Sequence, residues 1–116
     1  MNTRCYISVL NNDNSVDTVY CHENGAVKGV GKLLVKHYNT DEKVRKLLAK
    51  GALKSLGQTL SKCEFYEEPG PARFYTWDTA NEIASDYHYL FDPRRVLWLC
   101  RLSGGTECHD LSLLVK

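Results

Sequence analysis

The sequence predicts an α+β domain: an antiparallel sheet of about five or six strands, with two main helices inserted after the first hairpin. The first observation is a pair of β-rich segments, 4–10 and 16–22, on either side of the turn-forming residues 11–15. The second is the helical spacing of apolar residues between positions 26 and 50. The third is a group of short β-rich segments after residue 60, separated by residues typical of turns.

Length and charge restrict the class of protein. At 116 residues, 43% hydrophobic and 25% charged, the chain is expected to form a single domain, 1–116, with its own core. A net charge of +1 lacks the basic excess of a protein that binds duplex nucleic acid, but a small anionic ligand needs only a local basic pocket. We find no signal peptide and no apolar run of membrane-spanning length, so we expect a cytoplasmic protein without a membrane partner.

The five cysteines are expected to be reduced thiols, because their count is odd and their spacing is wide. No C-x-x-C or H-x3-H spacing occurs, so the sequence predicts no metal site, and it contains no cofactor motif that we recognise. Cys21–His22 and Cys108–His109 are neighbours whose side chains point to opposite faces of a strand, which argues against catalytic dyads. A pairing of Cys21 with the distant His88 stays open, and we predict no catalytic residue.

The first hairpin is followed by the two main helices. Side chains of strand 16–22 alternate between two mixed faces: Val16, Thr18, Tyr20 and His22 on one, and Asp17, Val19 and Cys21 on the other. Helices or another subunit are therefore expected to cover both faces. The first helix begins between residues 26 and 31 and runs to Tyr38; Thr40 is predicted to cap the second, which ends near Gly51. The basic residues of the second helix are expected to form a solvated face: Lys43, Arg45, Lys46 and Lys50.

The second half of the chain is expected to complete the sheet. A connector at 52–60 leads to a weak strand at 63–66, and the prolines and glycine of loop 67–72 fit no central strand. The remaining predicted elements are a strand at 73–77, a short helix capped by Asp78 or Thr79 and ending at 85, a strand at 87–91, a turn at 92–95, a strand at 96–102, a hairpin turn at 103–106 and a last strand at 108–116.

A glycine corner, defined as Gly25, Gly29 and Gly31 with Lys28 and Lys32, is the first candidate for holding phosphate. Glycine lets a backbone approach an anion closely, and a helix N-terminus offers unpaired N–H donors. The corner does not complete a phosphate-loop motif, because alanine and leucine occupy the required glycine and hydroxyl positions 26 and 33. The alternative is that these glycines only make a turn and a close contact between helix and sheet.

Arginines and aromatic residues provide a second candidate site. Arginine binds phosphate in bidentate fashion, and aromatic faces stack on bases. If 73–77 is a strand, Arg73, Tyr75 and Trp77 share one face. The predicted binding residues outside the glycine corner are Arg73, Phe74, Tyr75, Trp77, Arg94, Arg95 and His22. The same inventory includes Arg101, and Asp92 or Asn81 as partners for ribose hydroxyls.

The segment 20–57 resembles a group of small bacteriophage proteins. These proteins share a strand followed by three motifs in this order: Y-C-H-x-x-G, G-K-x-L-x-x-H-Y and G-x-x-S-x-L-G. The segment that corresponds to the third motif reads G-A-L-K-S-L-G in this chain, and Glu23 occupies a position that is often aromatic in the group. The resemblance covers about a third of the chain. It further implies the phage anti-Thoeris sponge proteins of the first type, which have an antiparallel sheet decorated by two helices. Those proteins assemble as oligomers and sequester cyclic ADP-ribose signals at subunit interfaces, and some also bind cyclic oligonucleotides.

Together these features predict a phage anti-defence protein that binds and hides a small cyclic nucleotide signal in the cytoplasm of the infected host, without cleaving it. Such a sponge acts by mass action, and a Kd of ~1 nM corresponds to about −12 kcal/mol. The apolar content of both faces of the first hairpin and of 96–102 also predicts a homo-oligomer. Two alternatives stay open: a protein-binding inhibitor of a host defence effector, and an enzyme that cleaves the signal with His22, His37 or His88 as acid or base.

Overall fold

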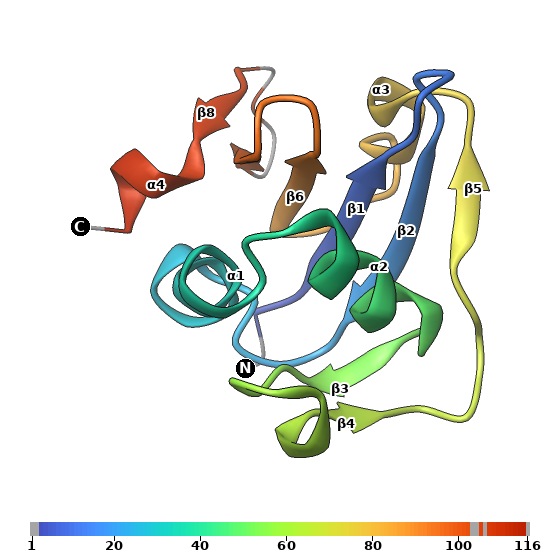
Figure 1. Cartoon of the computed structure of the whole chain (residues 1–116), viewed down its shortest axis with the longest axis vertical. Helices are drawn as coiled ribbons and strands as arrows, with labels where there is room; N and C mark the ends of the chain where they lie inside the picture. The colour runs from blue at the N-terminus through green and yellow to red at the C-terminus, as the bar shows by residue number, and fades with distance from the viewer. Residues whose placement is uncertain (1–2, 103–104, 106, 116) are drawn as a thin grey trace.

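The protein is built on a mixed sheet of 8 strands with helices on both faces, as a computed structural model shows (Figure 1). The structure describes residues 3–102, 105 and 107–115. The predicted α+β class is confirmed, and so is the insertion of the two main helices after the first hairpin. Among the described residues, no helix is long and apolar enough to cross a membrane.

The strands lie in the order β4-β3-β2-β1-β6-β7-β8, and β5 pairs with β2 off this path. Their bounds are β1 Cys5–Leu10, β2 Val16–Cys21, β3 Leu53–Ser55, β4 Glu64–Phe65, β5 Ala72–Phe74, β6 Tyr87–Asp92, β7 Leu97–Leu102 and β8 His109–Asp110. The sheet is not wholly antiparallel as predicted, because β1–β6 and β2–β3 are parallel pairs. Side-chain patterning in the sequence identifies which residues form strands. It does not identify which strands become parallel neighbours, because such strands are joined by long crossover connections.

The helices follow the predicted order up to residue 50. A π-helical turn η1, Val27–Gly31, leads directly into α1, Lys32–His37, and α2 spans Asp41–Ala49. The Thr40 side chain accepts a hydrogen bond from the Lys43 amide at 3.2 Å, as predicted for a helix cap. Gly51 follows α2 with φ +88°, a left-handed angle that favours glycine after a helix. The later helical segments are short: η2 Leu60–Lys62, α3 Trp77–Ala80 and α4 Leu111–Leu114.

The predicted connector 52–60 contains the strand β3, and the short helix predicted to end at residue 85 ends at Ala80. Two strand predictions in the second half are also wrong. The strand predicted at 73–77 ends at Phe74, because Thr76 caps α3 by accepting from the Thr79 amide at 3.2 Å; neither Asp78 nor Thr79 is the cap. The last strand predicted at 108–116 is reduced to β8, since Asp110 accepts from the Ser112 amide at 3.0 Å and starts α4. In both places a local side-chain cap overrides β propensity. Most of the predicted 103–106 turn, and residue 116, lie outside the described residues.

One face of the sheet carries the main core, with α1 and α2 packed over it (Figure 1). Alternate residues of the central strand β1 point into this core, and Cys5, Ile7 and Val9 are almost completely buried. Leu34 of α1 and Leu47 of α2 cover them from the helix side. Each such aliphatic side chain contributes about 1.5–3 kcal/mol on burial, so this face supplies most of the stability.

The opposite face is covered only in part. A smaller cluster packs under α3 and consists of Val16, Trp77, Ala80 and Leu90. Next to it, the buried hydroxyls of Ser8 and Thr18 share a hydrogen bond of 2.7 Å. Beyond this pair the face carries aromatic side chains instead of aliphatic ones. Helices thus cover this face less completely than predicted, and its cover by another subunit stays a prediction.

Buried hydrogen bonds tie the sheet to the segments that cover its main core. The Tyr89 hydroxyl of β6 donates to the Gly25 carbonyl at 2.6 Å, and the Gly25 amide donates to the Thr3 carbonyl at 2.8 Å. The Trp98 indole N–H of β7 donates to the Tyr38 carbonyl, at the end of α1, at 2.8 Å. A buried carbonyl that loses its donor costs about 1–3 kcal/mol, so these bonds hold the segment before η1 and the end of α1 against the sheet.

We therefore expect Tyr89→Phe to lower the free energy of unfolding by about 1–3 kcal/mol, because it leaves the Gly25 carbonyl unpaired in the core. Urea denaturation followed by circular dichroism measures this change. Tyr87→Phe is the matched control, since it removes a hydroxyl with no hydrogen bond in the described part of the chain from a ring stacked on Tyr89. Equal losses in the two variants would contradict the role of the Tyr89–Gly25 bond.

Candidate functional site

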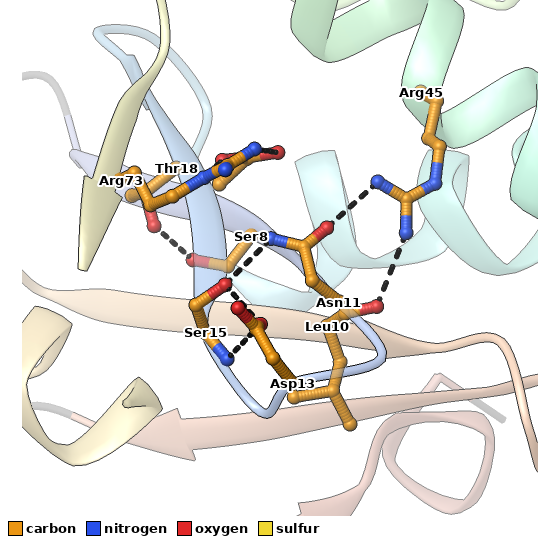
Figure 2. A network of polar contacts seen from close by, with 9 residues as sticks. Ser8, Leu10, Asn11, Asp13, Ser15, Thr18, Arg45 and Arg73 are labelled. Atoms are coloured by element: carbon orange, nitrogen blue, oxygen red, sulfur yellow. Dashed lines mark hydrogen bonds and ion pairs between the residues drawn. The ribbon is translucent and has the colours of Figure 1, made fainter. Parts of the chain in front are cut away.

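The turn between β1 and β2 is held by a polar network to which Arg45 reaches from α2 (Figure 2). The Arg45 guanidinium donates to Asn11 Oδ1 at 2.9 Å and to the Leu10 carbonyl at 3.2 Å. Asn11 in turn donates to Ser15 Oγ at 3.0 Å, and the Ser15 amide donates to Asp13 Oδ1 at 3.0 Å. The prediction that the basic residues of α2 form a solvated face is therefore wrong for Arg45, which anchors the hairpin turn.

Arg73, the first predicted phosphate ligand, forms a bidentate ion pair with Asp17 across the β2–β5 ladder. Its Nε and Nη2 lie 2.8 and 3.2 Å from the two Asp17 carboxylate oxygens. An open polar cavity of about 570 Å³ lies beside this pair and is lined by Asn11, Asn12, Asp13, Ser15, Asp41, Arg45, Arg73 and Pro93. The guanidinium fork that would receive phosphate is already filled by a carboxylate, so the geometry assigns Arg73 to holding β5 on the sheet.

Arg94 and Arg95 also have acceptors within the chain. Arg94 Nη2 donates to the Asn12 carbonyl and to Asn14 Oδ1, both at 3.2 Å. Arg95 Nε lies 2.8 Å from the Asp92 carboxylate. Both side chains fasten the turn after β6, and neither is in the lining of the cavity beside Arg73.

The predicted aromatic group around Arg73 does not form. The expectation that Arg73, Tyr75 and Trp77 share a strand face is wrong, because β5 ends at Phe74 and α3 begins at Trp77. Tyr75 is 91% exposed, whereas Trp77 is buried under α3 with Phe74 against the same cluster. A helix turns successive side chains by about 100°, so an alternating pattern cannot continue through residue 77.

The glycine corner has a packing role. The amides of Gly29 and Gly31 both donate to the Ala26 carbonyl, at 2.9 and 3.3 Å, so neither N–H is available to an anion. A Cβ on Gly29 would overlap the Asn24 carbonyl, and one on Gly31 would lie 3.2 Å from Leu111. The corner's lysines, Lys28 and Lys32, are exposed. These contacts agree with the alternative interpretation, a turn and a close approach of helix to sheet.

A different set of residues gathers on the open sheet face. We call it the ring row: Tyr66, His22, Tyr20, Tyr6 and His88. Successive ring centroids lie 6.4, 5.9, 5.4 and 5.6 Å apart. The last pair is stacked at 11°, and the Tyr20 hydroxyl shares a hydrogen bond of 2.7 Å with His22 Nδ1. The row crosses β2, β1 and β6 because the register sets Tyr6 opposite both Tyr20 and His88.

The ring row is accessible along most of its length. Tyr6, Tyr20 and His22 are half-buried, and Tyr66 is 37% exposed. Of the predicted site residues, only His22 belongs to it. The sequence contained a signal for the rest of the row that the prediction did not use. Tyr20 and His22 occupy alternate positions of one predicted strand and therefore lie on the same face.

A cavity of about 420 Å³ opens beside the His88 end of the row. Its lining is Asp78, Asn81, Glu82, Ile83, Ala84, Ser85, His88, Arg101, Leu102 and Gly105. The charged residues of this lining are Asp78, Glu82 and Arg101 of β7. The Arg101 guanidinium carbon lies 4.7 Å from the centre of the Trp77 ring. Arg101 Nη1 also pairs with Asp78 at 3.0 Å. Trp77, predicted as a stacking surface for a ligand, instead holds this arginine by a cation–π contact.

His88 closes the inner end of the cavity. Its Nε2 donates to the Ile83 carbonyl at 3.0 Å, and the ring is 5% exposed. Burial lowers the pKa of His88, and the nearby Arg101 charge lowers it further, against the opposing hydrogen bond to Ile83. The imidazole is therefore neutral at pH 7, and its buried ring packs against Tyr6.

Cys5 and Cys21 lie away from this face. Cys21 is opposite Cys5 on the core side of the sheet, whereas the register places His88 opposite Tyr6 on the other side. The pairing of Cys21 with His88 that the sequence left open is therefore wrong. In the ranges that the structure describes, no three His, Cys, Asp or Glu side chains are grouped so that they could hold a metal ion.

No protein-family model matches this chain, and no curated protein or solved structure is significantly similar to it. What the site can bind is therefore inferred from the ring row and its cavity.

Gly29→Ala tests the packing role of the glycine corner. We expect the free energy of unfolding to fall by about 1–3 kcal/mol from overpacking, which exceeds the roughly 1 kcal/mol that alanine gains in helix propensity. Thermal unfolding measures the difference. Gly70→Ala is the control, because a Cβ there meets no heavy atom within 4 Å. A Gly29→Ala protein as stable as the native chain would reopen the corner as a ligand site.

Asp17→Asn tests the Arg73–Asp17 pair through pH. The Arg73 hydrogen bond and charge lower the pKa of Asp17 against opposing burial. A lowered folded-state pKa gives stability that is present above the unfolded value of ~3.9 and is lost as pH falls through the folded value. We expect the native chain to be more stable than Asp17→Asn at pH 7, with the difference shrinking below about pH 4. A difference independent of pH, by urea denaturation, would exclude an ionic origin.

Proposed function

We propose that the protein binds a small nucleotide on its open sheet face and holds it without converting it. The observation that carries this proposal is the ring row, a continuous aromatic surface across three strands that ends at a cavity. Bases stack on aromatic side chains with about 1–3 kcal/mol each. A ligand that covers two rings of the row can therefore gain a substantial part of its affinity from stacking.

The cavity supports a ligand of nucleotide size. Its volume of about 420 Å³ lies within the ~300–1,000 Å³ that is typical of small-molecule sites. It combines the guanidinium of Arg101 with a carboxamide, a hydroxyl and the carboxylates of Asp78 and Glu82, while the adjoining row is aromatic. This separation of charge from ring surface matches a molecule with a phosphate at one end and a base at the other.

The resemblance of segment 20–57 to phage proteins suggests which nucleotide this is. We propose a cyclic signal of the cyclic ADP-ribose type, or a cyclic oligonucleotide, sequestered in the cytoplasm of an infected bacterium. In this role affinity and abundance are sufficient, since each bound signal molecule is withdrawn by mass action. His88, the histidine nearest the cavity, has its Nε2 directed at a backbone carbonyl, which favours retention of the ligand over acid–base cleavage.

A second copy of the chain is part of the proposal. The half-buried rings of the open face and the exposed Leu113 of α4, at 62%, leave apolar surface that an identical subunit can cover. A small domain also buries a ligand more completely between two subunits than on one surface. Size-exclusion chromatography with light scattering, with and without nucleotide, measures the subunit count, and a single-chain mass under both conditions would exclude the homo-oligomer.

Tyr20→Leu tests the ring row. We expect it to weaken binding of cyclic ADP-ribose or of a cyclic dinucleotide by about 5- to 150-fold, because one stacking ring is worth about 1–3 kcal/mol. Calorimetry measures the affinity. Tyr75→Leu is the matched control: this tyrosine is 91% exposed and lies off the row, so affinity should not change.

The proposal is wrong if neither nucleotide binds the native protein, or if the two variants lose affinity equally. Heat denaturation of the complex then separates the classes of function. A sequestering protein releases the nucleotide intact, and an enzyme releases a cleaved product. Nucleotide that stays free throughout indicates an inhibitor that acts on another protein.

A further inference from the structure

Three buried polar atoms without a hydrogen-bond partner in the described chain belong to residues that line the same cavity. They are Asn81 Oδ1, Ser85 Oγ and Arg101 Nε. A fourth such atom, Trp77 Nε1, belongs to a residue outside the lining. Native proteins leave few buried polar groups unpaired, since each costs about 1–3 kcal/mol. Three such atoms, all buried and all from residues that line one cavity, are accounted for if another molecule that enters the cavity supplies their polar partners.

The three atoms differ in chemistry and are complementary. Arg101 Nε carries a donor on a permanent cation, and the Ser85 hydroxyl can donate or accept. Asn81 donates with its Nδ2 to the Trp77 carbonyl at 2.8 Å, so its Oδ1 is left as an acceptor. The cavity thus presents a cationic donor, a hydroxyl and one neutral acceptor, beside the carboxylates of Asp78, which pairs with Arg101, and of Glu82.

The position of Arg101 favours an anion at its Nε edge. Asp78 occupies Nη1 from the outside, since its side chain is 83% exposed while that of Arg101 is 18% exposed. Guanidinium groups bind anions in bidentate fashion through Nε and Nη2, as Arg73 does with Asp17 in this same chain. The corresponding edge of Arg101 is the one whose Nε has no acceptor within the described residues. Contact with Trp77 holds the guanidinium in place, so little ordering is required when an anion binds.

We propose that this cavity binds a phosphate group of the ligand, with the Nε edge of Arg101 and the Ser85 hydroxyl on phosphate oxygens and Asn81 Oδ1 on a ligand hydroxyl or N–H. The assignment rests on the proposed function and adds an orientation to it: phosphate in the cavity, base along the ring row. It makes Arg101 the phosphate-binding arginine, in place of the predicted Arg73, Arg94 and Arg95. Asp78 tempers the charge of Arg101 and keeps the site from being strongly cationic when empty.

Nitrogen-15 NMR of arginine side chains tests the assignment with inorganic phosphate, AMP and adenosine as probes. We expect phosphate and AMP to shift the Arg101 Nε–H resonance, and adenosine to shift only ring-row resonances. Arg101→Lys keeps the charge but removes the fork, so it should weaken AMP binding at least tenfold, or about 1.4 kcal/mol. Arg94→Lys is the control and should leave AMP affinity unchanged. Ser85→Ala provides a second, smaller change if Arg101→Lys does not fold, and should weaken AMP but not adenosine.

The outcomes separate this inference from the proposed function. The phosphate site is overturned if neither phosphate nor AMP, added at about 10 mM, shifts the Arg101 Nε–H resonance. Such a result means a binding free energy weaker than about −3 kcal/mol, and it counts against the site even if adenosine shifts the ring-row resonances. If phosphate moves Arg101 while AMP and adenosine leave the ring row unchanged, the phosphate site stands and the nucleotide-binding function fails. Equal loss of AMP affinity in Arg101→Lys and Arg94→Lys would show a general charge effect and also overturn the assignment.

Discussion

The parallel pairing of β1 with β6 is the constraint on which the rest of this structure depends. Parallel neighbours cannot be joined by a tight turn, so the chain between them passes through β2, both main helices, the short strands at the sheet edge and α3 before β6 begins. The pairing places β1 at the centre of the sheet, with Cys5 and Ile7 completely buried. It also decides that α1 and α2 cover one face while α3 covers only a corner of the other.

This unequal covering separates stability from binding. On the closed face, aliphatic side chains and the buried bonds from Tyr89 and Trp98 leave little to exchange with solvent. On the open face, tyrosine and histidine rings replace aliphatic groups, and they tolerate partial exposure because each has an apolar surface and a polar edge. A sheet with one such face can accept a flat ligand without repacking its core.

The arginines show how context decides the role of one residue type. The guanidinium groups of Arg45 and Arg73 are hydrogen-bonded to partners from other elements, and each fastens a segment to the sheet. Arg101 is held on two sides, by Asp78 and by the face of Trp77, yet its buried Nε has no partner in the described residues. A guanidinium restrained in this way can bind an anion at its free edge with little rearrangement. A guanidinium whose Nε edge already holds a carboxylate must first break that ion pair, which costs free energy.

The sequence by itself determined the local features: the α+β class, the first hairpin, the Thr40 cap and the glycine after α2. These follow from side-chain alternation, caps and backbone angles over a few residues, which the chain sets without distant partners. The partner of Arg73 and the alignment of Tyr6 with Tyr20 and His88 were decided only by the tertiary structure. Asp17 lies 56 positions from Arg73, and the ring row requires both registers of β1 at once. Such contacts depend on which strands become neighbours, and that choice is made by packing of the whole chain.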